Sequence, residues 1–242
     1  MEGPSLVILK EQVSAFKGKK VLEVSGNSKI DKAIMMNQKV TGFLTWGKHF
    51  LICFDDLTLR IHFLMFGSYR INERKEAMPR LSLRFANGEL NLYSCAVKML
   101  EDEPDNLYDW SADVMSDAWS PRKTIKRVRE HSEASVSDLL LNQDIFAGVG
   151  NIIKNEVLFR IKVHPESITG ALKPRQLLSL VKEARAYSFD FYEWKKIYQL
   201  RKHWLVYNKK NCPRCKVPLT KKPTGKGKRR SFFCENCQVL YK

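Results

Sequence analysis

Four of the six cysteines form two pairs near the C-terminal end of the sequence. Cys212 and Cys215 make one C-x2-C motif, and after 18 intervening residues Cys234 and Cys237 make a second. Two residues between cysteines aim both thiolates at one point, as a tetrahedral zinc site requires. Two disulfides are the alternative, and the chain shows no secretory signal that would favour them. The pattern predicts a structural zinc ribbon.

The positive charge is concentrated in the same region. The sequence carries 42 lysine and arginine residues against 26 acidic ones, a net charge of +16 with a pI near 9.6. Residues 195–242 hold 15 of these cations and one acid, Glu235, whereas residues 1–194 hold 27 basic and 25 acidic residues. This balance indicates a polyanionic partner and a dedicated phosphate-binding face. A solubilising tail is the alternative, which the aromatic residues and cysteines of the segment disfavour.

A glycine-rich turn offers a second place for a phosphate. Gly148, Val149 and Gly150 precede Asn151, with helical periodicity on both sides. Glycine permits close backbone approach, and free amides at a helix start attract an anion. Two packed helices without a ligand are the alternative. We expect Asn151 either to cap its own helix or to bond a phosphate oxygen.

Helices must position this turn. Ser135 and Asp138 form an S-x-x-D pattern that predicts the start of a first helix, which ends at the glycines. A second helix is expected from Asn151 to just before His164, and a longer one from Pro174. The second half of the chain is therefore predicted to be helical up to the zinc ribbon.

The first hundred residues contain apolar runs and alternating apolar and polar residues, as β-strands do. Expected strands are 39–54, 57–66, 80–85 and 89–99, after one short helix within 4–17. Asn87-Gly88 indicates a tight hairpin. Cys53 and Cys95 lie singly in these segments and are expected to be small buried hydrophobes. The acidic, proline-containing stretch 101–122 then marks a boundary, so the pattern predicts an α+β protein with a β domain first.

Composition excludes several protein classes. Hydrophobic residues make up 44% of the chain and charged residues 28%, which is ordinary for a globular protein. No apolar run approaches the roughly 18 residues of a membrane span, and no signal peptide is recognisable at the N-terminus. We therefore expect neither a membrane protein nor a secreted one.

Together these motifs resemble the formamidopyrimidine-DNA glycosylase and endonuclease VIII family almost end to end, and are nearer its endonuclease VIII-like branch. The resemblance rests on these segments: Glu2-Gly3-Pro4, Trp46-Gly47-Lys48, Leu92-Tyr93-Ser94, residues 139–165 with the Gly-Val-Gly-Asn turn, and the cysteine ribbon with Arg229 five residues before Cys234. It implies an antiparallel β-sandwich, a helix–two-turn–helix DNA clamp and a zinc-stabilised β-hairpin. It also implies excision of oxidised bases followed by strand cleavage.

The sequence departs from the family at its first residue. Family members usually begin with Pro-Glu after loss of the initiator methionine, and the proline amine is the nucleophile. Met1 stands in that place here, and because Glu2 is not small we expect Met1 to be retained. Its primary α-amine, with a pKa of about 7.7–8.0, is roughly one-tenth neutral at pH 7 and can attack a sugar C1′. The alternative is a DNA-binding protein that has lost catalysis.

The resemblance implies further catalytic residues. Glu2 matches the family's catalytic glutamate, which transfers protons during base loss, with a solvated terminal acid as the alternative. Lys48, expected on a strand, matches the lysine that holds the phosphate beside the lesion, with a generic exposed lysine as the alternative. Arg229 matches the hairpin arginine that grips phosphates and promotes the second elimination, and the adjacent Arg230 is the alternative by one residue. Glu156 matches an acid near the nucleophile, or is a surface helix residue.

The element that opens the duplex is also implied by the resemblance. Leu64, Met65 and Phe66 align with the family's wedge loop, nearer its endonuclease VIII version, and such apolar side chains fill the gap left by an extruded base. The Arg-Phe pair of formamidopyrimidine enzymes is missing, since residues 93–95 read Tyr-Ser-Cys, and this favours oxidised pyrimidines. The alternative places Leu64 and Phe66 in the sandwich core. His62 is expected to be a satisfied strand histidine.

We therefore expect a bifunctional DNA glycosylase and AP lyase that binds damaged DNA and one zinc ion, monomeric, cytoplasmic and nucleoid-associated. The expected domains are a catalytic sandwich at 1–118, a helical DNA-binding domain at 119–207 and the ribbon at 208–242. The expected DNA contacts are Lys48, Leu64, Met65, Phe66, Asn151, Arg229 and Arg230. One rival is a non-catalytic protein that binds abasic or flipped-base DNA. Another, a zinc-ribbon transcription factor, explains the ribbon but neither Glu2 nor Lys48.

Overall fold

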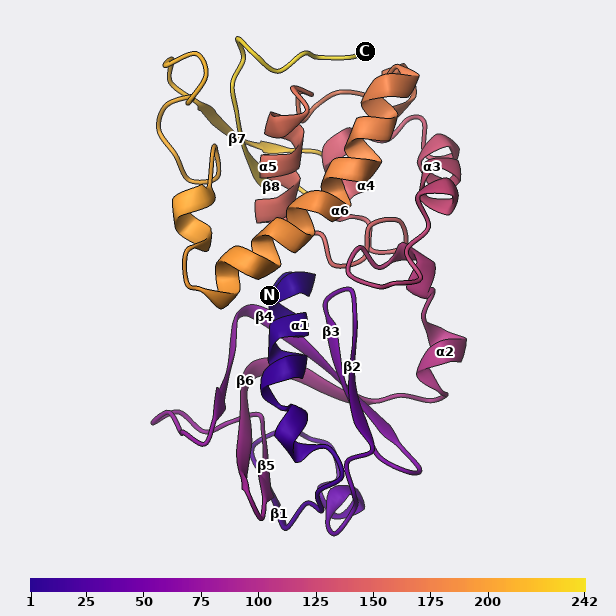
Figure 1. Ribbon diagram of the computed structural model, residues 1–242, viewed down its shortest axis with the longest axis vertical. Coiled ribbons are helices and arrows are strands. Elements are labelled where there is room, and N and C mark those ends of the chain that lie inside the picture. The colour runs from indigo at the N-terminus through magenta and orange to yellow at the C-terminus, as the bar shows by residue number, and fades with distance from the viewer. The chain divides into compact units, whose positions relative to one another are not determined.

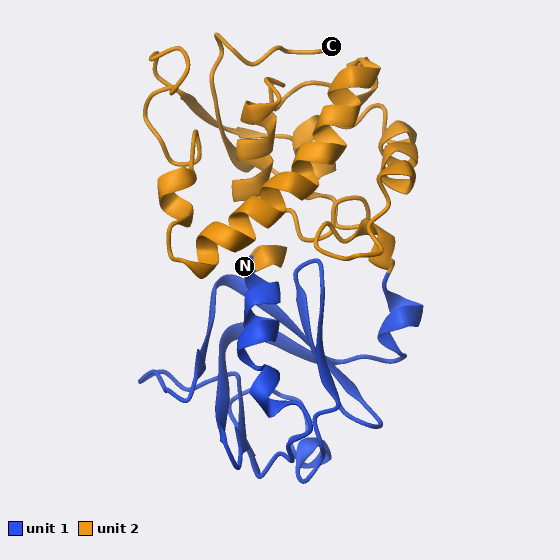
Figure 2. Ribbon diagram, viewed as in Figure 1, with its two compact units in different colours: residues 1, 5–108 blue, residues 2–4, 109–242 orange.

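A computed structural model describes residues 1–242, which divide into two compact units (Figure 2). Unit 1 comprises Met1 with Ser5–Tyr108, and unit 2 comprises Glu2–Pro4 with Asp109–Lys242. The N-terminal helix α1 (Gly3–Gln12) therefore has its first residues in unit 2 and the rest in unit 1. The sequence-based domains 1–118, 119–207 and 208–242 stay predictions.

Unit 1 is built on one six-stranded antiparallel ladder in the order β1-β5-β6-β4-β3-β2 (Figure 1). Its strands are β1 (Glu23–Ser25), β2 (Gly42–Trp46), β3 (His49–Cys53), β4 (Thr58–Ile71), β5 (Leu81–Phe85) and β6 (Gly88–Met99). The short helices are η1 (Ser14–Phe16), η2 (Ala33–Met35) and α2 (Pro104–Leu107). Apolar side chains from strands far apart in the ladder, such as Phe43 of the edge strand β2 and Leu83 of β5, share one buried cluster with Leu6 of α1. This is the expected β-sandwich.

Two strand predictions for unit 1 need correction. The segment 39–54 is not one strand but the hairpin β2–β3, which turns at Gly47 with a φ of +54°. Lys48 lies in this turn and not on a strand. Strand β4 runs to Ile71, five residues beyond its expected end, after an irregularity between Phe63 and Ser68 where its pairing with β6 shifts register. The Asn87-Gly88 turn joins β5 to β6 as predicted.

Unit 2 consists of helices followed by a small sheet. Its helices are η3 (Trp110–Ala112), α3 (Pro121–Glu130), α4 (Val136–Leu141), α5 (Asn151–Arg160), η4 (Thr169–Ala171), α6 (Pro174–Lys196) and η5 (Leu200–His203). Strands β7 (Thr220–Thr224) and β8 (Arg229–Phe233) form an antiparallel hairpin. Ser135 caps α4 as its sequence pattern predicts, because its Oγ accepts the N–H of Asp138 at 3.1 Å. The helices α3 to α6 share one hydrophobic core.

The hairpin packs against α5, which lies between it and α6 in Figure 1. A second, smaller apolar cluster joins Phe159 of α5 to Val206 and to Phe232 of β8. None of the helices in the structure has the length and apolar character of a membrane span.

Candidate active site and nucleic-acid interface

The N-terminus of α5 is capped by Glu2, a residue 150 positions away in the sequence. The Glu2 carboxylate accepts the backbone N–H of Ile152 at 2.7 Å and that of Ile153 at 3.2 Å. The helix's own N-cap residue, Gly150, supplies no side chain for this purpose. The first amides of a helix need an acceptor, and their dipoles favour a carboxylate. Glu2 is therefore a fixed anion within unit 2 and not a solvated terminal acid.

The glycines of the turn make this approach possible. A Cβ on Gly150 would lie 2.4 Å from the Cδ and Cγ atoms of Glu2, so only glycine leaves room for the carboxylate. Gly148 has a φ of +96°, and its carbonyl accepts the N–H of Gly3 at 2.9 Å. The side chain of Gln143 braces the same loop by accepting the N–H of Gly148 and donating to the carbonyl of Val149.

Asn151 does not cap its own helix, so that alternative is wrong. It is the first residue of α5, and its Nδ2 donates to the carbonyl of Arg230 on β8 at 3.0 Å. Its Oδ1 is buried without a hydrogen-bond partner. Because an amide nitrogen carries two hydrogens, one N–H of Asn151 is still available to a ligand.

Glu156 is fully buried on α5, so its alternative as a surface helix residue is also wrong. Its carboxylate accepts three backbone N–H groups, from Leu205, Val206 and Tyr207, at 2.8–3.0 Å. Burial raises the pKa of this carboxyl, while the three amide hydrogen bonds and the charge of Arg160 oppose the increase. Glu156 thus fixes the segment that leads into the ribbon.

That segment lines a cavity of about 420 Å³ that sequence reasoning missed. The cavity is lined by Asn151, Arg201, Trp204, Tyr207, Asn208, Arg230 and Phe232. The indole N–H of Trp204 is buried and has no partner. Aromatic residues interleaved with cations form the surfaces that bind single-stranded nucleic acid. The run from Arg201 to Tyr207, in which Arg201 and Lys202 are followed by Trp204 and Tyr207, is the signal that could have found it.

The two hairpin arginines face different surroundings. Arg229 and Arg230 are both exposed at the start of β8. Successive side chains of a strand point to opposite faces. Arg230 shares its face with Phe232 and lines the cavity, whereas Arg229 shares its face with the buried Ser231.

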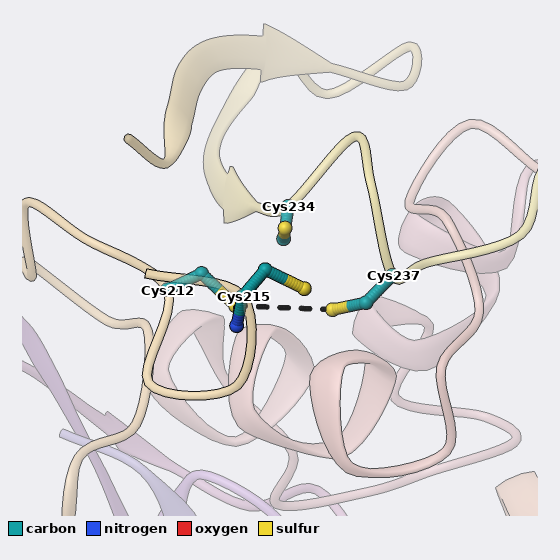
Figure 3. A group of neighbouring side chains, drawn as sticks. All are labelled: Cys212, Cys215, Cys234 and Cys237. Carbon is teal, nitrogen blue, oxygen red and sulfur yellow. Dashed lines mark hydrogen bonds between the residues drawn. The ribbon is translucent and has the colours of Figure 1, made fainter. Parts of the chain in front are cut away.

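The four ribbon cysteines converge as their spacing predicts (Figure 3). All four are free thiols, and their sulfur atoms lie within 4.8 Å of one another, with 3.8 Å between those of Cys212 and Cys237. Tetrahedral zinc with Zn–S bonds of about 2.3 Å separates its sulfur ligands by about 3.8 Å. The donor set and its spacing therefore fit a closed zinc site, and the disulfide alternative does not apply.

In unit 1, Lys48 and the α-amine of Met1 both lie near His62 of β4. Burial lowers the pKa of His62, a hydrogen bond to the backbone of Lys48 opposes this, and the positive charges of the Met1 amine and of Lys48 lower it further. The Nδ1 atom of His62 is buried without a partner, so the ring is only partly satisfied. The Met1 side chain packs against the sandwich core.

The irregular stretch of β4 carries the expected wedge. The side chains of Leu64, Met65 and Phe66 are 53%, 80% and 85% exposed, so the alternative that places Leu64 and Phe66 in the core is wrong. The stretch lies opposite Ser94, whose φ is +48°, and the neighbours of Ser94 on β6, Tyr93 and Cys95, are buried. Cys53 is only half-buried. Three consecutive large apolar side chains in solvent indicate a binding surface.

Comparison with known proteins identifies the helical part of unit 2. Residues 111–187 match the formamidopyrimidine-DNA glycosylase H2TH domain. Over 207 residues the chain is 32% identical to endonuclease 8-like 3 of Mus musculus, covering 82% of this chain and 34% of that protein. It is 25% identical to formamidopyrimidine-DNA glycosylase of Cytobacillus firmus over 234 residues, covering 86% and 84% of the two chains. The chain spans 34–38% of the length of the endonuclease 8-like 3 proteins that it matches.

Solved structures share the fold. A viral DNA glycosylase superposes with a TM-score of 0.86 at 18% identity, over 99% of this chain and 100% of that one. Lactococcus lactis formamidopyrimidine-DNA glycosylase, non-covalently bound to DNA with an AP site, superposes with a TM-score of 0.87 at 21% identity, over 98% and 99% of the two chains. With its H2TH domain, its sandwich and its four-cysteine ribbon, the chain belongs to the formamidopyrimidine-DNA glycosylase and endonuclease VIII family.

Proposed function

We propose that this protein is a bifunctional DNA glycosylase and AP lyase that removes oxidised bases, with pyrimidines favoured, and then nicks the strand. The observation that carries the proposal is the capture of Glu2 at the N-terminus of α5, where the carboxylate is fixed by two amides. A carboxylate held in this way is placed to transfer protons beside the residue that precedes it, Met1. The cavity that Asn151 and Arg230 line, with its cations and the unpartnered indole N–H of Trp204, supplies a site for DNA phosphates.

The proposed reaction starts from the neutral α-amine of Met1. Its nitrogen attacks C1′ of the damaged nucleotide, and the glycosidic bond breaks with its electron pair leaving on the base, which takes up a proton. Glu2 transfers the protons for base loss and for opening of the sugar ring, which gives a Schiff base between the amine and C1′. Loss of a proton from C2′ then expels the 3′ phosphate and cuts the strand.

The remaining site residues stabilise charge in this proposal. Lys48 holds the phosphate next to the lesion and assists the first elimination, while Arg229 stabilises the phosphate that leaves in a second elimination. Asn151 and Arg230 bind the DNA backbone through the cavity. Glu156 has an indirect role, because its three hydrogen bonds fix the backbone of the segment that carries Tyr207.

Leu64, Met65 and Phe66 fill the space that the extruded nucleotide leaves in the duplex. Their exposure supports this role, since side chains that pack on nothing in the free protein can enter a base stack. Residues 93–95 contribute no exposed apolar or arginine side chain, which supports a preference for oxidised pyrimidines. The partner is damaged DNA, and we propose that the protein acts as a monomer in the cytoplasm, associated with the nucleoid.

The proposed protein also contains one structural zinc ion. Cys212, Cys215, Cys234 and Cys237 would hold one ion in a closed site, where it stabilises the fold of the ribbon. No residue of the proposed reaction is a zinc ligand.

Borohydride trapping tests the proposal. DNA with an oxidised pyrimidine, mixed with the protein and borohydride, should yield a covalent adduct, because reduction fixes the Schiff base. Peptide mapping should find the sugar remnant on the N-terminal peptide. Tight binding of lesion DNA without any adduct would instead favour the rival, a non-catalytic protein that binds abasic or flipped-base DNA.

A further inference from the structure

Lys154 is a lysine with no exposed surface in the middle of α5. Its ammonium nitrogen lies 2.8 Å from Oγ of Ser231 and 3.5 Å from the carbonyl oxygen of Arg230, both on β8. Burial lowers the pKa of Lys154 to about 8, with smaller effects from Asp138 and Glu2, which raise it, and from Arg229, which lowers it. A buried ammonium whose partners are neutral oxygens destabilises a fold. The burial of the Lys154 ammonium therefore needs a reason other than stability.

The contacts of Lys154 continue through a chain of buried hydroxyl groups. The Oγ of Ser231 lies 2.6 Å from Oγ1 of Thr224 on β7, which donates to Oγ of Ser137 on α4 at 3.2 Å. Ser137 in turn donates to the carbonyl of Pro165 at 2.7 Å. All three hydroxyl residues are buried. Lys154 therefore joins both strands of the hairpin to two helices of the H2TH domain.

The carbonyl oxygen of Arg230 is where the donors of α5 converge. Besides Lys154, it receives Nδ2 of Asn151 at 3.0 Å and Nδ2 of Asn155 at 3.3 Å. Asn155 also accepts the N–H of Phe232 at 2.7 Å. Three polar contacts from one helix thus fix one peptide group, the group that follows Arg230.

The tip of the hairpin is held separately. Asp138 of α4 accepts the backbone N–H groups of Lys226 at 2.8 Å and Gly227 at 3.2 Å. Loss of the Lys154 contacts would therefore leave the hairpin attached at its tip, at the cysteine ribbon and at Asn151 and Asn155, and would loosen it only around Arg230 and Ser231. This makes the effect of Lys154 local.

We propose that Lys154 is a positioning residue, which sets the hairpin arginines relative to the N-terminus of α5 through the Arg230 carbonyl and the Ser231 hydroxyl. Lys154 itself touches no DNA, since it has no exposed surface. The inference rests on the proposed function for the claim that the hairpin arginines bind DNA. The placement of the hairpin itself can be measured without DNA.

The test compares Lys154→Met with the wild type and with Lys182→Met, which makes the same chemical change on the exposed face of α6. Methionine has a similar length but no N–H donor. Hydrogen exchange of the amides in 220–233 should become at least about tenfold faster in Lys154→Met, while exchange in α6 is unchanged. Affinity for lesion DNA should fall roughly tenfold, with a salt dependence that is weaker by about one unit.

Thermal stability separates positioning from general support of the fold. Because the folded-state pKa of Lys154 lies below its unfolded value, its burial destabilises the protein most below pH 8, and this cost declines as the pH rises toward the unfolded pKa. At pH 7 the melting temperature of Lys154→Met should therefore equal or exceed that of the wild type. Lys154→Gln, which restores an N–H donor without a charge, should recover most of the DNA affinity.

Unchanged exchange of the hairpin amides in Lys154→Met would overturn the inference, whatever the DNA results. A lower melting temperature with faster exchange throughout unit 2 would also overturn it, since that describes an ordinary structural residue. If the wild-type protein neither binds lesion DNA nor forms a borohydride adduct, the proposed function fails, and the exchange comparison still decides the role of Lys154.

Discussion

Glu2 lies so close to Gly150 that a Cβ at residue 150 would stand 2.4 Å from the Glu2 carboxyl carbon. Heavy atoms do not approach to this distance without displacement. The two residues are 148 positions apart, and their contact puts a carboxylate against the first amides of α5. The glycine at 150 is therefore best explained by the space that Glu2 occupies, because its own φ of −119° is available to any residue.

Gly150→Ala should displace the Glu2 carboxylate and lower the rate of base excision by roughly 10²-fold, the scale of a proton-transfer contribution. Glu2→Gln should lower the rate similarly, because the amide cannot accept and return the proton. Single-turnover excision of an oxidised pyrimidine, measured beside DNA affinity, would check both. Gly42→Ala is the matched control, since a Cβ there meets nothing within 4 Å. An unchanged rate in Gly150→Ala would contradict the role of the Glu2 contact.

Metal content should show one zinc ion per chain, and Cys212→Ser should lose it. Cys212 is fully buried in the small cluster with Phe159 and Phe232, so loss of the ion should unfold the ribbon and weaken DNA binding at least about tenfold. Elemental analysis and binding assays before and after chelation would measure this. Cys53→Ala should keep its zinc, because Cys53 lies in unit 1. Zinc-free protein with full affinity would refute a structural metal.

The zinc cluster was predictable because its geometry is set by local spacing, whereas the contacts of α5 were not. A C-x2-C pair brings its own sulfurs together wherever it occurs. The Glu2 contact joins residues at opposite ends of the sequence, and no periodicity reports it. Lys154 looks like one polar residue on a helix, yet it is buried because β8 covers it. The apolar character of 39–54 hid the β2–β3 turn, since only Gly47 and Lys48 separate the two strands.

The exposed apolar residues of β4 should matter for duplex DNA and not for stability. Met65→Ala and Phe66→Ala should leave the melting temperature within about a degree, because side chains 80% and 85% exposed contribute little packing. Excision from duplex DNA should fall about tenfold, and excision from single strands should fall less, because an unpaired base leaves no gap to fill. Met78→Ala, at 69% exposure in the same unit, is the control. Equal losses on both DNA forms would speak against a wedge.

Arg229 and Arg230 should have separable effects because they lie on opposite faces of β8. Arg230→Ala should weaken DNA binding similarly for all sequences and reduce the salt dependence by about one unit, as expected for a cavity that holds a phosphate. Arg229→Ala should leave the first elimination and suppress the second, which gel analysis of the 3′ ends resolves. Arg84→Ala, whose arginine pairs with Glu23 at 2.7 Å in unit 1, controls for loss of one cation. If Arg229→Ala weakened DNA binding and Arg230→Ala suppressed the second elimination, the elimination role would belong to Arg230.

The N-terminal amine is the most direct point at which to test the chemistry. An α-amine with a pKa of about 7.7–8.0 is neutral often enough at pH 7 to act as a nucleophile, whereas a lysine with a pKa near 10.4 is neutral less than about one-thousandth of the time. Acetylation of the Met1 nitrogen, or an added residue before it, should therefore abolish the borohydride adduct and the lyase product. DNA affinity should stay within about threefold, because Lys48, Asn151 and Arg230 are unchanged.

Reaction of the unmodified protein below pH 7 should slow about tenfold per pH unit, since protonation removes the neutral amine. If the blocked protein still forms the adduct, a side-chain amine is the nucleophile, and Lys48→Met in the blocked protein would show whether it is Lys48.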